Sequence, residues 1–272
     1  MTMSIFNFFK KSGKSVVDNA PEYSIPNSAS LPEMTETTTQ SEVESSNINV
    51  SEETKRVHNL IILDESGSMQ SIYQPALTGV NETLQTIREA QKEHENQTHF
   101  VSLIAFDTGH YNQIYNHIAA EKAIDITQEQ YRPGGGTPLY DAMGRSINEL
   151  RPNVVKGDIV LVTVITDGYE NASREYNGKA IKNLVEAMKK EGWVFTYIGA
   201  NQDVEAVAAS MSIDNHLAFD ADDESTGAMF KHERRSREKF FSKLSRNMPL
   251  CDLSTGYFDE DDERDKDNKV KF

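Results

Sequence analysis

The segment "HNLIILDESGSM", residues 58–69, joins a hydrophobic run to a group of oxygen-bearing side chains. The run is continuous and bounded by polar residues, which predicts a buried β-strand. The strand ends at Asp64, and Ser66 and Ser68 follow at alternate positions. An acid and two alcohols with this spacing form a set of oxygen donors. The segment therefore predicts a core strand, and whether its oxygen donors form a binding site depends on partners elsewhere in the chain.

Hydrophobic runs of this kind alternate with helical patterns along the chain. Continuous runs are typical of strands in a parallel sheet that is covered on both faces. Residues 110–118 and 121–126 are expected to form a short strand pair at the edge of the sheet. The predicted fold is α/β: a doubly wound, mostly parallel central sheet with helices on both faces and one antiparallel edge strand. Strands are expected over 58–64, 98–107, 158–168, 193–201 and 215–220, and helices over 75–96, 137–151, 177–192, 203–211 and 225–247.

The two ends of the chain differ in composition from its centre. The N-terminal part is rich in Ser, Thr and Glu, and such a segment cannot bury enough apolar surface to offset its conformational entropy. The C-terminal end is an acidic charge run. We therefore expect a disordered leader over 1–55, one domain over 56–256 and a charged, solvated tail over 257–272.

Composition argues against several classes of protein. The chain has 272 residues and a formal net charge of -15, whereas nucleic-acid binders that neutralise phosphates are normally basic. No apolar run reaches the roughly 18 residues of a membrane-spanning helix, and the aromatic residues near the start precede the lysines, the reverse of a secretory signal. One cysteine, Cys251, excludes an intrachain disulfide and fits a reducing compartment. We expect a cytoplasmic protein with no membrane span and no nucleic-acid partner.

A second segment, "RPGGGTPLYDA" at residues 132–142, brings glycines and a threonine to the start of a predicted helix. Pro138 suits the first helical position, and Thr137 could then act as the N-cap, with its hydroxyl on a backbone amide. Alternatively, Thr137 turns its hydroxyl outward as a ligand. Three consecutive glycines are more than a cap requires, which favours a site.

A third segment, "VITDGYEN" at residues 164–171, ends the most hydrophobic predicted strand with Asp167. Asp-Gly is common in simple turns, and this is the plain interpretation of the pair. The position of Asp167 nevertheless matches that of Asp64, because both acids follow buried strands. The carboxyl ends of parallel strands lie at the same edge of a sheet, so the three segments are expected to converge.

Together these segments offer five oxygen-bearing side chains. Oxygen-only ligands select a hard cation such as Mg²⁺, Mn²⁺ or Ca²⁺, and the lack of His and Cys disfavours zinc and copper. We expect the hydroxyls of Ser66, Ser68 and Thr137 to bind the ion directly. The carboxylates of Asp64 and Asp167 would bind it directly or through water, and one coordination position would stay open.

The predicted domain resembles a von Willebrand factor type A domain. Asp64-x-Ser66-x-Ser68, Thr137 and Asp167 are similar in order and spacing to the metal-ion-dependent adhesion site of that family, and every ligand position is filled. The segments "GGGTPLYDA" and "TDG" look like those of bacterial members. The resemblance covers neither end of the chain. It implies a doubly wound α/β fold with a divalent cation at its top.

The resemblance also implies binding rather than catalysis. In this family a partner's Asp or Glu completes the coordination of a Mg²⁺-type ion. Bacterial relatives without a signal peptide often serve as adaptors to ATPases or stress-response complexes. We therefore expect a non-enzymatic, cytoplasmic adaptor of bacterial or phage type whose protein partner presents an Asp or Glu.

An enzyme is the alternative. A strand that ends in Asp-x-Ser is similar to the start of haloacid dehalogenase-like phosphatases, in which Asp64 would be the nucleophile and "FDADD", residues 219–223, the late acidic pair that holds Mg²⁺. In that family the residue two positions after the nucleophile is usually Asp, and here it is Ser66. The glycines before Thr137 have no role in that scheme, so we prefer the binding role.

Further expectations concern residues beside the motifs and near the end of the domain. Glu65 and Glu170 are interpreted as solvated loop charges, the basic residues of the 225–247 helix as a solvated face, and Cys251 as a small apolar filler. Four residues could form the rim of a binding surface, and ordinary packing explains them equally well: Met69, Tyr73, Tyr140 and Tyr169.

Overall fold

The first predicted strand, β1 (Lys55–Asp64), lies inside a six-stranded sheet. The structure is a computed structural model that describes residues 54–259. The strand order is β3-β2-β1-β4-β5-β6, and every neighbouring pair is parallel except β2 and β3. The predicted fold class is confirmed, with β3 as the antiparallel edge strand. The other strands are β2 (Gln97–Phe106), β3 (Tyr111–Ala119), β4 (Ile159–Thr166), β5 (Trp193–Ala200) and β6 (Asn215–Phe219).

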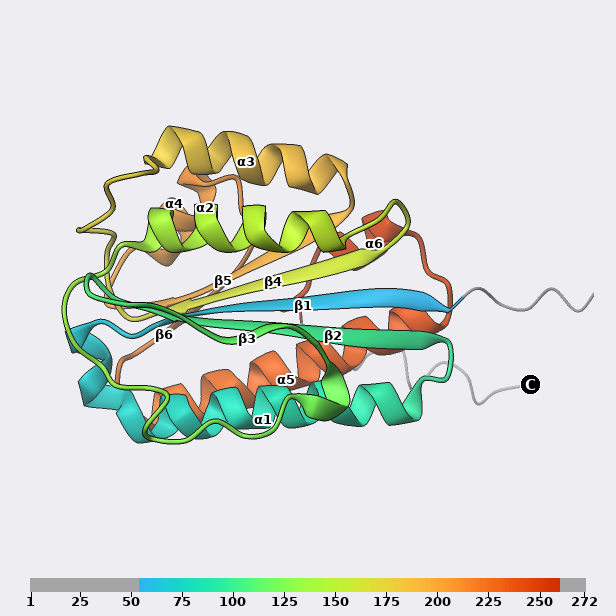
Figure 1. The fold of residues 1–272 in the computed structure, drawn as a ribbon, viewed down its shortest axis with the longest axis horizontal. Coiled ribbons are helices and arrows are strands. Elements are labelled where there is room, and N and C mark those ends of the chain that lie inside the picture. The colour runs from blue at the N-terminus through green and yellow to red at the C-terminus, as the bar shows by residue number, and fades with distance from the viewer. Residues whose placement is uncertain (1–53, 260–272) are drawn as a thin grey trace, which may run out of the picture. The chain divides into compact units, whose positions relative to one another are not determined.

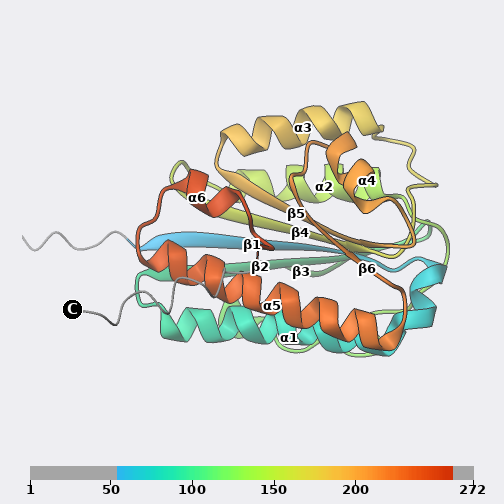
Figure 2. The ribbon, with the colours of Figure 1, turned by 180° about the vertical axis from the view of Figure 1, so that it is seen from behind.

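Helices cover both faces of the sheet (Figures 1 and 2). In Figure 1, α2, α3 and α4 lie above the sheet, and α1 and α5 lie side by side below it. The chain reverses direction across the sheet at β1, because β2 lies on one side of β1 and β4 on the other. Ligand sites form at such a switch point, beyond the carboxyl ends of the strands. The helices are α1 (Tyr73–Glu93), α2 (Leu139–Leu150), α3 (Gly178–Lys190), α4 (Val204–Ser210), α5 (Asp223–Ser245) and α6 (Leu250–Ser254).

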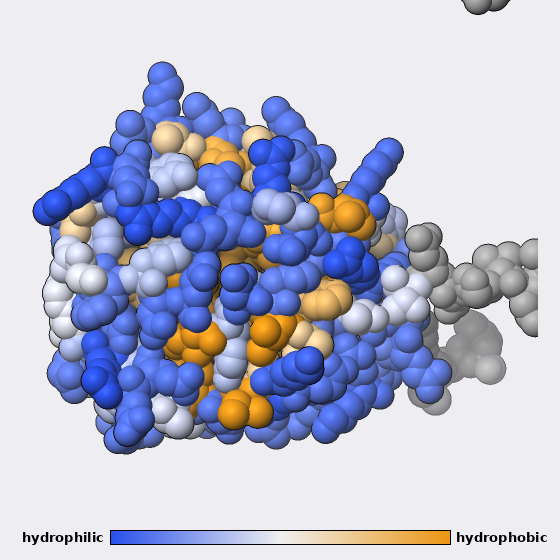
Figure 3. All heavy atoms as spheres, in the orientation of Figure 1, coloured by the Kyte–Doolittle hydropathy of each residue, from blue (hydrophilic) through white to orange (hydrophobic). Residues whose placement is uncertain are grey.

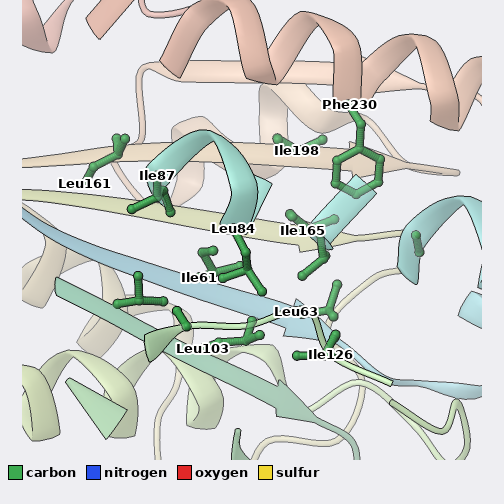
Figure 4. Packing of buried hydrophobic residues seen from close by; sticks show 14 of the residues in the cluster. Ile61, Leu63, Leu84, Ile87, Leu103, Ile126, Leu161, Ile165, Ile198 and Phe230 are labelled. Carbon is green, nitrogen blue, oxygen red and sulfur yellow. The ribbon is translucent and has the colours of Figure 1, made fainter. Parts of the chain in front are cut away.

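Alternate residues of β1 enter two separate hydrophobic cores. Ile61 and Leu63 belong to the core that contains α1 and α5, whereas Leu60 and Ile62 belong to the core that contains α2 and α3. Figure 4 shows Leu84 of α1 pointing toward Ile61 on the sheet. Successive side chains of a strand point to opposite faces, so continuous hydrophobicity means burial on both sides. Packing on both faces holds the carboxyl end of β1 in place.

The contact between α1 and α5 depends on Gly79. A β-carbon at this position would lie 2.0 Å from ring atoms of Phe230. We therefore expect Gly79→Ala to lower the free energy of unfolding by about 1–3 kcal/mol through overpacking. Gly227 of α5 is the matched control, since a β-carbon there meets nothing within 4 Å. Gly227→Ala should raise stability by up to about 1 kcal/mol, because alanine favours the helix.

Urea unfolding of the two glycine variants checks this prediction. A Gly79→Ala variant as stable as the native chain would show that the two helices do not approach as closely as the structure has them.

The second strand predicted at the edge, over 121–126, is wrong. This segment contains a short 3-10 helix, Ala120–Lys122, followed by irregular chain that runs past α1. The side chain of Asn81 on α1 accepts from the N–H of Ile126 at 2.8 Å and donates to its carbonyl at 3.0 Å. An amide side chain thus satisfies the backbone groups that a strand partner would have satisfied, and Ile126 is buried as part of the core.

The basic face expected on the last helix is solvated only in part. Arg237 is fully buried on α5, in an ion pair with Glu233, where its Nη2 lies 2.7 Å from Glu233 Oε1. Its guanidinium also donates to Asn59 Oδ1 at 3.1 Å and to Thr163 Oγ1 at 2.8 Å. Arg234 of the same helix is exposed, as expected. Sequence periodicity does not distinguish these two arginines, because a buried charge is tolerated only where partners from other elements surround it.

Folded residues extend past both predicted domain boundaries. β1 already begins at Lys55. Tyr257 is buried, with its ring 5.9 Å from that of Phe240. The rest of the predicted leader and tail, residues 1–53 and 260–272, lies outside the described residues.

The face of the molecule seen in Figure 3 is mainly polar. Figure 3 shows a face covered mostly by hydrophilic side chains, with a small group of hydrophobic ones in its lower half. Among the helices of residues 54–259, none has the length and apolar character needed to cross a membrane. Cys251 is exposed, so its interpretation as an apolar filler is wrong.

Candidate metal centre

The first and third sequence motifs meet at one edge of the sheet. Asp64 is the last residue of β1, and Asp167 follows the last residue of β4. The two strands are parallel neighbours, with Leu63 opposite Ile165. The hydroxyl of Ser68 donates to Asp167 Oδ1 at 2.5 Å, which joins the two loops directly.

Asp64 is fully buried, and both of its carboxylate oxygens accept hydrogen bonds. The N–H of Ser66 donates to Oδ1 at 2.7 Å, and the hydroxyl of Thr166 donates to Oδ2 at 2.6 Å. The first bond closes a turn of the kind that Asp side chains favour, and it presents the Ser66 hydroxyl 3.1 Å from that of Ser68. Burial raises the pKa of Asp64 to about 6, against these hydrogen bonds, which lower it.

Asp167 is buried and only half satisfied. Its Oδ1 accepts from Ser68, but its Oδ2 has no hydrogen-bond partner among the described residues. Burial raises the pKa of this carboxyl group above its ordinary value. A buried carboxylate oxygen without a partner is costly, and such groups usually mark a place for water or an ion.

Thr137 lies beside the same cluster. Its N–H donates to Asn171 Oδ1 at 2.9 Å, and the N–H of Asn171 donates to the Thr137 carbonyl at 3.1 Å. A β-carbon placed on Gly168 would lie 3.7 Å from the Thr137 hydroxyl and 3.5 Å from the Ser68 hydroxyl. Gly168 of the third motif therefore lies near hydroxyls of the other two motifs, so all three motifs meet at this edge of the sheet.

The alternative role of Thr137 as a helix N-cap is wrong. α2 begins at Leu139, and no side chain of the preceding residue caps it. The N–H of Tyr140, in the first turn of α2, instead donates to the carboxylate of Glu170 at 2.9 Å. Because the loop after β4 supplies this acceptor, the Thr137 hydroxyl is not needed for capping.

The glycine-rich segment approaches the first motif through its backbone. The N–H of Gly67 donates to the carbonyl of Gly135 at 3.0 Å, and the N–H of Gly134 donates to the carbonyl of Glu65 at 2.8 Å. Gly135 has a φ of 66°, and a β-carbon there would lie 2.4 Å from the Thr108 hydroxyl. A left-handed backbone and a close approach both require glycine here. This pairing of loops joins the segment that carries Thr137 to the segment that carries the two serines.

Two acids beside the ligand candidates have a role that the sequence did not reveal. Glu65 is buried, and its carboxylate accepts from the N–H of Arg132. Glu170 accepts from the N–H groups of Tyr140 and Ala172, each at 2.9 Å. Their interpretation as solvated loop charges is wrong, because each holds one loop of the candidate site to another. No signal in the sequence separates such acids from solvated ones.

The residues considered for a binding rim separate into two groups. Met69 is fully buried and belongs to the core. Tyr73 and Tyr140 are partly buried, and Tyr73 stacks on Tyr131, whose hydroxyl donates at 3.0 Å to the carbonyl that ends β1. Tyr169 is 54% exposed. Of the four, Tyr169 offers the largest surface to a partner.

The donor set suits a hard cation. Within residues 54–259, no three His, Cys, Asp or Glu side chains gather in a way that could hold a metal ion. The candidate site has two carboxylates, and its other donors are hydroxyls. Mg²⁺ and Mn²⁺ accept such oxygen ligands and keep several waters, so these ions need few carboxylates. The unpartnered oxygen of Asp167 is the feature of this site that a cation would satisfy directly.

The phosphatase alternative requires Asp64 and the acids of residues 219–223 to lie together, and the structure places them apart. The segment 219–223 begins at the last residue of β6, three strands away from β1 in the sheet order. At about 4.8 Å per strand this is a separation of roughly 14 Å. Asp222 caps α5 by accepting from the N–H of Ser225 at 2.8 Å. Both oxygens of Asp64 are already occupied, so the arrangement does not present it as a nucleophile.

Comparisons with known proteins concern the fold. No protein-family model matches the sequence, and no curated protein matches it significantly. The PilB minor pilin from Streptococcus sanguinis, in its D319A mutant, is similar in structure, with 13% identity, a TM-score of 0.50 and coverage of 72% of this chain and 64% of the pilin. The chain thus spans less than two thirds of the pilin's length.

Two further structures carry the name of the family that the motifs resemble. A von Willebrand factor type A protein from Catenulispora acidiphila matches with 13% identity, a TM-score of 0.44 and coverage of 68% of this chain and 43% of that one. The vWF domain of the type V pili tip protein Mfa5 from Porphyromonas gingivalis matches with 10% identity, a TM-score of 0.48 and coverage of 68% and 96%. At these identities the likeness concerns the fold alone.

Proposed function

We propose that the chain is a divalent-cation-dependent protein-interaction module. In this proposal the hydroxyls of Ser66, Ser68 and Thr137 bind Mg²⁺, or Mn²⁺ or Ca²⁺ in its place, and Asp64 and Asp167 bind it directly or through water. The observation that carries the proposal is the unpartnered, buried Oδ2 of Asp167 within a cluster of hydroxyl groups. A partner's Asp or Glu would complete the coordination.

The charge balance of the site supports binding of an acid. Two carboxylates and three neutral hydroxyls leave a bound divalent ion without excess negative charge around it. An incoming carboxylate would then gain a strong interaction at a partly dried interface. In this proposal the site binds rather than catalyses. The function proposed is therefore recognition of an acidic residue on another protein.

We further propose a cytoplasmic adaptor of bacterial or phage type. A single cysteine, exposed on α6, fits a reducing compartment. An ATPase or a stress-response complex is the class of partner that the family resemblance suggests.

Carboxylate binding can be tested with a small probe. Mn²⁺ bound to the full chain enhances the relaxation of water protons, and a carboxylate that takes the open position displaces a water. We expect the α-amide of N-acetylaspartic acid, which keeps its side-chain carboxylate, to reduce this enhancement. N-acetylasparaginamide, its neutral match, should leave the enhancement unchanged. Equal effects of the two probes, or no effect of either, would contradict the proposal.

The raised pKa of Asp64 predicts how metal binding depends on pH. A folded-state pKa of about 6 against 3.8 unfolded means that the metal-free fold binds this proton more tightly than the unfolded chain does. The stability that this bound proton contributes to the metal-free fold is fully present below about pH 4, and it is lost as pH rises through about 6. Mn²⁺ needs the ionised form, so its affinity should fall about tenfold per pH unit below about pH 6.

Denaturation with and without Mn²⁺ at pH 5 and pH 7 measures this linkage. We expect the stabilisation by Mn²⁺ to be larger at pH 7. The same stabilisation at both values would show that no such proton is displaced.

A further inference from the structure

A polar pocket of about 360 Å³ lies beside the candidate metal centre. It is lined by the loop after β2, the start of α2 and the loop after β4. Pro138, which follows the ligand candidate Thr137, is part of its wall. The wall residue Thr108 accepts from the N–H of Gly136 at 3.0 Å, on the other side of Thr137. A partner bound to the ion would therefore reach this pocket with a neighbouring residue.

The acids of the pocket are engaged by the protein itself. Asp107 Oδ1 accepts from the N–H groups of Gly109 and His110, each at 2.6 Å. Asp141 accepts from three consecutive N–H groups in the loop after β4, each at 2.8 Å. Amide groups with their positive ends toward these carboxylates offset much of their charge. Both acids serve to hold loops in place and are poorly placed to capture a cation.

The cations of the pocket retain free hydrogen-bond donors. Arg145 uses Nε and Nη2 in its ion pair with Glu175, which leaves Nη1. The guanidinium of Arg174 has no ion pair or side-chain hydrogen bond within the part of the chain that the structure describes. The side chain of His110 is 74% exposed, but its Nδ1 lies 3.2 Å from Asp107 Oδ1, so His110 adds no free donor at that nitrogen. Arg174 and Arg145 therefore hold unused N–H donors, and a planar guanidinium suits a carboxylate.

We propose that this pocket receives a second carboxylate of the same partner, with Arg174 as its main contact. This inference rests on the proposed function and specifies it: the partner would carry two acidic residues close together, one on the ion and one in the pocket.

Synthetic peptides test the inference on the Mn²⁺-loaded full chain. The two-acid probe is acetyl-Asp-(Gly)n-Asp-amide, with spacers of one to four glycines, which reach about 7–17 Å when extended. In the one-acid control peptides, one of the two Asp residues is replaced with Asn. In a further set of peptides, one of the two Asp residues is replaced with Lys. Binding is measured by displacement of water from Mn²⁺, as above. Two acids alone improve binding about twofold, because either of them can bind the ion. We expect an improvement of about tenfold at the best spacing, from a charge-assisted pair with Arg174.

Two variants locate the second carboxylate. Arg174→Gln should reduce the advantage of the two-acid peptide to the twofold statistical value, while Mn²⁺ affinity and binding of one-acid peptides stay unchanged. Lys182→Gln, which removes one exposed positive charge on α3, should keep the full advantage.

The outcomes distinguish the two proposals. If Mn²⁺ does not bind, or one-acid peptides fail to displace water, the proposed function itself fails. If one-acid peptides bind but the second Asp adds only the statistical factor, only the pocket inference is overturned. Tighter binding of the Lys peptides, or an advantage that survives Arg174→Gln, would also overturn it.

Discussion

Asp167→Asn is expected to lower the affinity of the domain for Mn²⁺ by about 100-fold or more, because it removes a carboxylate from the centre of the site. The same change should stabilise the metal-free protein. Asp167 is buried with an unpartnered oxygen and a raised pKa, so a neutral amide in its place relieves the cost of burying the charge. Loss of metal affinity together with a gain in stability is typical of a residue retained for function.

The affinity is measured from the spectrum of free Mn²⁺ during titration, and stability by thermal unfolding with a chelator present. Asp203→Asn is the matched control, since Asp203 is exposed and caps α4 by accepting from the N–H of Ala206 at 3.1 Å. Asparagine caps helices as well as aspartate does, so neither quantity should change. Unchanged Mn²⁺ affinity in the Asp167 variant would contradict its assignment as a ligand.

Glu233→Gln is expected to lower the free energy of unfolding by about 3–5 kcal/mol, because it leaves the charge of Arg237 buried without its counter-ion. Both side chains of this pair are fully buried. The comparison is with Glu238→Gln, which breaks the pair with Arg234 on the same helix at the same spacing. That pair is about half exposed, so its loss should cost less than about 1 kcal/mol.

Urea unfolding of the two glutamine variants gives both values. Equal losses would mean that α5 does not bury Arg237 against Asn59 of β1 and Thr163 of β4 as the structure has it.

The fold was largely predictable because its strands are buried on both faces. Continuous hydrophobic runs such as 58–64 and 158–168 are typical of strands inside a sheet that helices cover on both faces. The segment 121–126 misled the prediction for a physical reason. Its apolar residues pack against α1, and the side chain of Asn81 supplies the hydrogen bonds of an absent strand. Sequence patterns record burial, but they do not record which element satisfies the backbone.

The candidate site was predictable for residues that end strands and unpredictable for those that hold loops together. Asp64 and Asp167 follow hydrophobic runs, so the parallel sheet alone brings them to one edge. Glu65 and Glu170 depend on contacts between segments far apart in the sequence. Such contacts follow from tertiary packing and leave no local pattern. The burial of Arg237 was not predicted either, because it also depends on contacts with other elements.

The most direct test of the account is the anomalous scattering of Mn²⁺ in crystals of the protein soaked with a manganese salt. We predict one strong peak in contact with the hydroxyl oxygens of Ser66, Ser68 and Thr137, at the side of Asp167 where Oδ2 has no partner. A map without a peak at the carboxyl ends of β1 and β4, or with its peak elsewhere, would contradict the account.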